Sequence, residues 1–90
     1  MYKLKNYMED LVIKRTDEIL KSMDVCKCDK CKLDIIALAL NSLPSKYVVS
    51  AKGELYAKVS ELEQQFDIDV GTAIIKAAFL VNENPRHNEE

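Results

Sequence analysis

The stretch Cys26-Lys27-Cys28-Asp29-Lys30-Cys31 holds all three cysteines of this 90-residue chain and leads directly into an apolar segment, residues 33–40. Thiols separated by charged side chains do not form an ordinary core cluster, because the charged neighbours would be buried with them. Thiolates are ligands that zinc prefers, and a C-x-C-x-x-C turn allows three sulfurs to converge on one tetrahedral ion. We therefore predict a zinc-binding loop around which the fold is organised.

A tetrahedral zinc site needs a fourth ligand, and His87 is the single histidine of the chain. A site of Cys26, Cys28, Cys31 and His87 would join the C-terminal tail to the middle of the chain. Two alternatives remain open at this point. The cysteines could be reduced and exposed with His87 in solvent, or Cys28 and Cys31 could form a redox pair, with the helix dipole lowering the thiol pKa of Cys31. No strand-helix pattern typical of thioredoxins surrounds that pair.

The composition favours a helical protein. Hydrophobic residues make up 48% of the chain, whereas only two glycines and two prolines are available for the turns of a sheet. We predict an all-α fold, a single domain over residues 1–90 with four to five helices. A core of this size is marginally stable, so a metal or a partner chain is expected to help stabilise it.

Charge and hydropathy limit the classes of partner. The net charge of -2 and the isoelectric point near 5.4 argue against direct DNA binding, which requires a basic surface. The sequence begins without the apolar run of a signal peptide and contains no segment of ~20 apolar residues, so no membrane partner is expected. The predicted location is the cytoplasm, where an odd number of reduced cysteines is common.

Apolar residues at helical spacing predict helices over residues 6–23, 33–43, 51–66 and 70–81. Arg15 projects from the middle of the first apolar stripe, so it either pairs with a carboxylate at the edge of the core or binds a phosphate or carboxylate ligand. The second helix is apolar on almost every side and is expected to be the buried central helix. Its Asp34 and Asn41 are seven residues apart and therefore lie on the same side.

A second set of apolar positions predicts a homodimer. Ile13 and Leu20 lie away from the main stripe of the first helix, and residues 33–43 and 70–81 are apolar on most sides. A monomer of this length cannot bury all of these surfaces.

No catalytic motif is present in the sequence, which has neither a G-x-S-x-G turn nor a glycine-rich phosphate loop. Four protein ligands would also close the coordination sphere of zinc, leaving no position for an activated water molecule. The chain is therefore predicted not to be an enzyme.

The C-x-C-x-x-C turn is followed by the run D-x-x-A-L-A-L-N-x-L-P-x-x-Y over residues 34–47, then by two predicted helices and the tail Asn84-Pro85-Arg86-His87. In this order of features the chain resembles the late competence development protein ComFB family along nearly its whole length. The resemblance implies a small all-helical homodimer. It also implies a zinc site of Cys26, Cys28 and Cys31 with a fourth ligand from the C-terminal part, where some members have a cysteine and this chain has His87.

The resemblance also implies a role linked to late competence and DNA uptake, and a cyclic di-GMP ligand. Such a ligand requires cations for its phosphates, a planar group against guanine and polar groups for the base edges. The residues predicted to bind it are Arg15, Asp34, Asn41, Lys46, Tyr47 and Arg86. Two other hypotheses are kept: a structural adaptor that binds an unknown protein partner without a nucleotide, and a thiol oxidoreductase.

Overall fold

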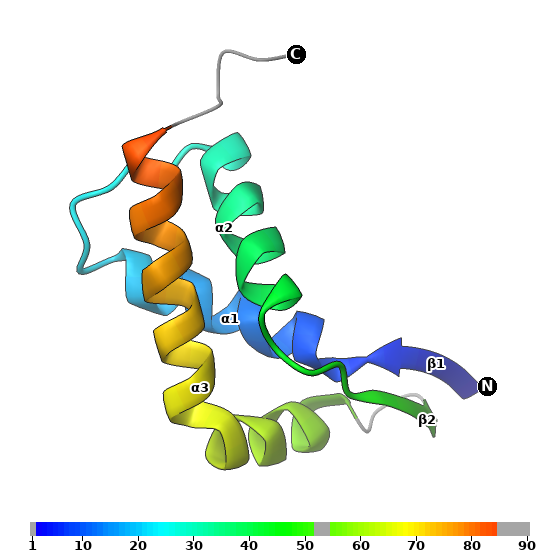
Figure 1. Ribbon diagram of the computed structural model, residues 1–90. Helices are drawn as coiled ribbons and strands as arrows, with labels where there is room; N and C mark the ends of the chain where they lie inside the picture. The colour runs from blue at the N-terminus through cyan, green and yellow to red at the C-terminus, as the bar shows by residue number, and fades with distance from the viewer. Residues whose placement is uncertain (1, 52–54, 85–90) are drawn as a thin grey trace.

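The computed structural model describes residues 2–51 and 55–84, which form three helices and a two-stranded antiparallel sheet (Figure 1). In chain order the elements are β1 (Tyr2–Asn6), α1 (Tyr7–Leu20), α2 (Asp29–Asn41), β2 (Tyr47–Ala51) and α3 (Leu55–Glu83). The fold is therefore α+β, and the prediction of an all-α domain with four to five helices is wrong.

The sheet accounts for much of this difference. β1 pairs with β2 in the register Leu4↔Val49 and Asn6↔Tyr47, so the first residues of the chain are extended rather than helical. Leu4, whose spacing fits the core stripe predicted for the first helix, is 72% exposed. Tyr47, Val48 and Val49 are aromatic and β-branched, which favours a strand once Pro44 has ended the preceding helical pattern.

Asn6 joins this sheet to α1. Its side-chain Oδ1 accepts hydrogen bonds from the backbone N–H of Met8 at 3.2 Å and from that of Lys46 at 2.8 Å. The first bond caps α1 at its N-terminus, and the second fixes the approach to β2. The helix consequently begins at Tyr7, one residue after the predicted start, and ends at Leu20.

The two helices predicted over residues 51–66 and 70–81 are one bent helix. α3 runs from Leu55 to Glu83, and only Phe66, at φ -120° and ψ 23°, departs from helical geometry (Figure 1). The predicted break at Asp67-Ile68-Asp69 is therefore a kink. Arg15 of α1 lies beside it, with Nη1 3.5 Å from Glu63 and 3.3 Å from Asp67, one carboxylate on each side of Phe66.

The carboxylate contacts of Arg15 explain why an arginine lies within an apolar stripe. Its side chain is 23% exposed and also approaches Glu18 at 3.8 Å. The predicted pairing of this arginine with carboxylates at the edge of the core is thus confirmed. Its predicted contact with a ligand stays a prediction.

The core lies between the three helices (Figure 1). Fully or nearly buried members include Met8, Leu11, Val12 and Leu20 from α1, Cys31, Ile35 and Ala39 from α2, and Val70, Ile74 and Ala78 from α3. Leu20 is 2% exposed, so it belongs to the core, and the second apolar stripe expected on α1 reduces to Ile13.

α2 is buried on one face only. It spans Asp29–Asn41, beginning four residues before the predicted start. Leu33 is 64% exposed and Leu38 is 41% exposed, whereas Cys31, Ile35 and Ala39 are buried. The prediction of a wholly buried central helix is wrong, because α1 and α3 cover a single side of it. None of the described helices combines the length and apolar composition that crossing a bilayer would require.

The ion pair between α1 and α3 makes stability depend on pH. The Lys14 ammonium, 2.8 Å from Glu63 Oε1, holds the pKa of that carboxyl below its ordinary value; Arg15 adds to this effect and partial burial opposes it. Because the pKa is lowered on folding, the stabilisation is present above the unfolded-state pKa of about 4.3 and is lost as the pH falls through the folded-state value.

We therefore expect Glu63→Gln to lower the free energy of unfolding at pH 7 by about 1 kcal/mol, the scale of a partly exposed pair. The difference from the wild type should disappear at acidic pH, where Glu63 is protonated. Urea unfolding between pH 3 and pH 7 measures this difference. The single variant Lys14→Met and the double variant Lys14→Met/Glu63→Gln complete a double-mutant cycle. A constant difference across this pH range would show that the charge of Glu63 does not contribute.

Candidate metal centre

The three cysteines come from the connection between α1 and α2 and from the first turn of α2. Cys28 is the N-cap of α2, and its Sγ accepts a hydrogen bond from the backbone N–H of Cys31 at 3.4 Å. The backbone N–H of Lys32 donates to the carbonyl of Cys28 at 2.9 Å, which closes the first turn. The start of the helix thus fixes Cys28 and Cys31 relative to each other.

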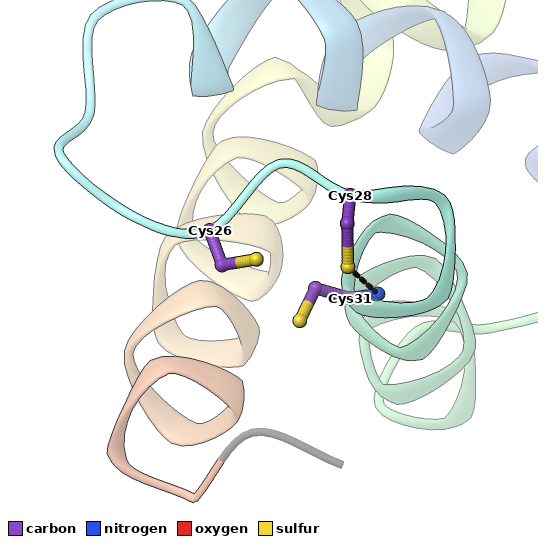
Figure 2. Close-up of side chains that lie close together, drawn as sticks. All are labelled: Cys26, Cys28 and Cys31. Carbon is purple, nitrogen blue, oxygen red and sulfur yellow. Dashed lines mark hydrogen bonds between the residues drawn. The ribbon is translucent and has the colours of Figure 1, made fainter. Parts of the chain in front are cut away.

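The three sulfur atoms lie close together (Figure 2). The ligand atoms of Cys26, Cys28 and Cys31 lie within 4.8 Å of one another, and no disulfide links them. In a tetrahedral site with zinc–sulfur bonds of about 2.3 Å, neighbouring sulfurs are about 3.8 Å apart, so small side-chain rotations would suffice. The predicted convergence is confirmed, and the group could hold a metal ion.

Burial differs among the three thiols. Cys31 is fully buried and joins the hydrophobic core, Cys26 is half-buried against it, and Cys28 is exposed. The expectation that none of the thiols would belong to the core is therefore wrong for Cys31. Its position on the inner face of α2, four residues before Ile35, explains the burial. The group lies at the edge of the core, with one sulfur inside and one at the surface.

Burial raises the pKa of the Cys31 thiol to about 12, and the hydrogen bonds and charges of Cys26 and Cys28 act in the same direction. Without a metal, Cys31 is thus a neutral thiol near pH 7. A divalent cation would favour the thiolate and release its proton on binding. A redox cysteine, in contrast, requires a lowered pKa, so this environment does not favour the oxidoreductase hypothesis.

The fourth predicted ligand, His87, and the predicted ligand-binding residue Arg86 lie outside the described residues. Within residues 2–51 and 55–84, no histidine or carboxylate joins the cysteine group. The C-terminal end of α3 lies at the same end of the molecule as the N-terminal start of α2 (Figure 1). The chain therefore leaves its last helix near the end that carries the cysteines.

Two of the residues predicted to bind a nucleotide lie together. Asp34 and Asn41 of α2 line a hollow of about 380 Å³ that is completed by Leu38, by Leu80 of α3 and by Asn84, which follows α3. Their predicted placement on one side of the helix is confirmed. The Asp34 carboxylate accepts hydrogen bonds from Lys30 Nζ at 2.9 and 3.1 Å.

The remaining predicted residues lie elsewhere. Lys46 and Tyr47 line a smaller hollow of about 170 Å³ beside Tyr7 and Gln65, and Lys46 Nζ lies 4.9 Å from the centre of the Phe66 ring. Arg15 lines neither hollow and contacts the carboxylates at the kink. The structure therefore places Asp34 with Asn41 and Lys46 with Tyr47, but it does not bring the two pairs together.

Sequence reasoning missed several residues in or beside the hollows. Lys30 was not connected with Asp34, although a lysine and an aspartate four residues apart on a helix commonly pair. A further hollow of about 380 Å³ adjoins the cysteine loop and is lined by Asp17, Leu20, Lys21, Lys27 and Lys32. Lys27 and Lys32 could have been noticed because they lie between and directly after the cysteines. Lys32 pairs there with Asp17 at 2.6 Å, which raises the lysine pKa.

Known proteins share both this sequence pattern and this fold. The family model "Late competence development protein ComFB" matches residues 5–85. The competence protein ComFB of Bacillus subtilis (strain 168) is 27% identical over 78 residues, which cover 87% of this chain and 76% of the relative. A solved structure of the late competence protein ComFB from Bacillus subtilis superposes with a TM-score of 0.82 at 22% identity, covering 98% of this chain and 100% of that one.

The structural match supports the α+β arrangement of helices and sheet, and the family model covers both the cysteine group and α3. The chain belongs to the late competence development protein ComFB family.

Proposed function

We propose that this chain is a non-enzymatic regulatory protein of the competence class whose fold is held together by one structural zinc ion. The observation that carries the proposal is the convergence of three thiol sulfurs within 4.8 Å at the start of α2. Zinc at this point would link the loop after α1, the first turn of α2 and the edge of the core. A closed site with four protein ligands would offer no open position for catalysis.

His87 is the proposed fourth ligand. Support comes from the end of α3, which brings the chain to the end of the molecule that carries the cysteines (Figure 1). The imidazole would complete a three-cysteine, one-histidine set, a common composition of structural zinc sites.

A homodimer is the proposed assembly. Apolar side chains on α2 and α3 are exposed in the single chain; Leu33, Phe79 and Leu80 are 57–64% exposed. Large apolar patches on a small protein usually mark an interface. We also propose, from the sequence, that the protein is cytoplasmic and that it binds a protein partner, which is not identified.

Cyclic di-GMP is the proposed ligand, on the basis of the family. The hollow of Asp34 and Asn41 supports this choice, because its size lies within the usual range of ligand sites, about 300–1,000 Å³. The amide and carboxylate offer acceptors and donors for a guanine edge, and Lys30 beside Asp34 offers a cation for phosphate.

Calorimetric titration of the zinc-loaded protein with cyclic di-GMP tests the ligand. We expect saturable binding at tens of micromolar or tighter, equivalent to about -6 kcal/mol or better. Asn41→Ala should weaken it at least tenfold, while Lys21→Ala, in the hollow beside the cysteine loop, should leave it unchanged. If the wild type releases no heat and shows no saturation, the nucleotide proposal fails and the adaptor hypothesis, which the exposed apolar residues also support, takes its place.

A further inference from the structure

The outward face of α3 beyond the kink carries a regular apolar stripe. Ile68, Ile75 and Phe79 are 79%, 41% and 57% exposed, and the exposed Thr72 lies between them. These four residues are named the α3 seam. The opposite face of the same helix carries Val70, Ile74, Ala77 and Val81, which are buried against α1 and α2. The α3 seam therefore takes no part in packing the core of its own chain.

The spacing of the α3 seam is that of a helix-pairing surface. Its members follow one another at intervals of four, three and four residues, and Asn82 continues the pattern with an interval of three. Alternating steps of three and four define the a and d positions at which two helices pack side by side. With Ile68 and Ile75 at d, Thr72 and Phe79 occupy a. The pattern thus points to a helix as the covering element.

The charges beside the α3 seam indicate which helix covers it. Asp69 and Lys76 directly follow Ile68 and Ile75, so both lie on the same flank of the seam, at the e positions. The two side chains carry opposite charges. Neither forms an ion pair with another residue in the described part of the chain. The other flank, at the g positions, carries Gly71 and Ala78, which are uncharged, and Ala78 is buried in the core of its own chain.

We infer that the α3 seam packs against the same seam of a second copy in the antiparallel orientation. In antiparallel pairs the e positions of the two helices face each other, which places Asp69 beside Lys76 of the partner subunit, and two-fold symmetry repeats the contact. In a parallel pair each e position would face a g position, here Gly71 or Ala78, and no ion pair would form. Opposite charges therefore select the antiparallel arrangement.

The apolar layers are compatible with this register. Ile68 packs against Phe79 of the partner subunit, and Thr72 packs against Ile75 of the partner subunit, so large and small side chains alternate along the seam. The patch is self-complementary, as a two-fold interface requires. This inference rests on the proposed homodimer and assigns its interface.

Sedimentation velocity across a dilution series, on the zinc-loaded full chain, tests the contact surface. Phe79→Ala should raise the dissociation constant of the dimer roughly a hundredfold or more, because a central aromatic side chain is lost from both subunits. Ile13→Ala, an exposed apolar residue of α1, is the matched control and should leave dimerisation unchanged. Circular dichroism confirms that each variant folds.

Charge exchange tests the orientation. Asp69→Lys alone and Lys76→Glu alone should each weaken self-association, since each places like charges opposite one another twice. An equimolar mixture of the two variants should restore dimers as heterodimers, because one subunit then carries two lysines on this flank and the other subunit carries two carboxylates. A wild-type dimer that is insensitive to Phe79→Ala and to both charge changes would overturn the interface while leaving the proposed dimer intact. A wild type that stays monomeric would overturn both.

Discussion

Removal of zinc is expected to lower the melting temperature of this protein sharply, and elemental analysis of the purified protein is expected to give one zinc per chain. Structural zinc contributes apparent binding free energies on the order of 10 kcal/mol, and this energy stabilises the fold because the unfolded chain has no preformed site. A domain of this size has a total stability of only about 5–15 kcal/mol. Thermal unfolding with and without a chelator measures the effect.

Cys28→Ser is the informative variant for this prediction. Serine is a favoured N-cap residue, so the substitution keeps the cap of α2 while it removes a zinc ligand. We expect loss of the metal and a melting temperature close to that of the chelated wild type. His87→Ala should weaken zinc binding less severely, because water can occupy the vacated position. A protein purified without metal, or a Cys28→Ser variant with unchanged zinc content, would contradict the structural zinc.

Leu11→Ala is expected to lower the free energy of unfolding by about 2–5 kcal/mol, the range observed for leucine removal from well-packed cores. Leu11 is fully buried among the three helices, so a cavity would remain on the side of α1 that both other helices contact. Denaturant unfolding of the zinc-loaded protein measures the difference. Ile13→Ala, on the same helix at a position that is 48% exposed, is the matched control and should change stability by no more than about 0.5 kcal/mol. Equal effects of the two substitutions would mean that α1 does not form the centre of the core.

Local sequence patterns predicted the elements that depend on local chemistry. The charged cysteine stretch predicted converging thiols because short spacing in a turn leaves them few other arrangements. The side shared by Asp34 and Asn41 followed from helical periodicity alone. Both results depend on residues within about one or two helical turns of each other.

The sheet and the kink depend on contacts between distant residues. β1 is separated from its partner strand by two helices, and its lysine-rich sequence is equally compatible with a helix. The segment Asp67-Ile68-Asp69 follows a bend in α3 and does not end the helix. At this kink, Arg15 of α1 contacts carboxylates on both sides of Phe66, and local sequence cannot predict such a contact. The same contacts explain why Arg15 lies apart from the hollow of Asp34 and Asn41. Periodicity predicts which face a residue occupies but not which neighbour it meets.

X-ray absorption at the zinc K-edge of the purified protein tests the central metal site most directly. The proposed site predicts a first shell of three sulfurs at about 2.3 Å and one nitrogen at about 2.0–2.1 Å. In Cys28→Ser the sulfur contribution should fall together with the zinc content. A protein that contains no zinc, or a first shell built from oxygen and nitrogen without sulfur, would contradict a metal site at Cys26, Cys28 and Cys31.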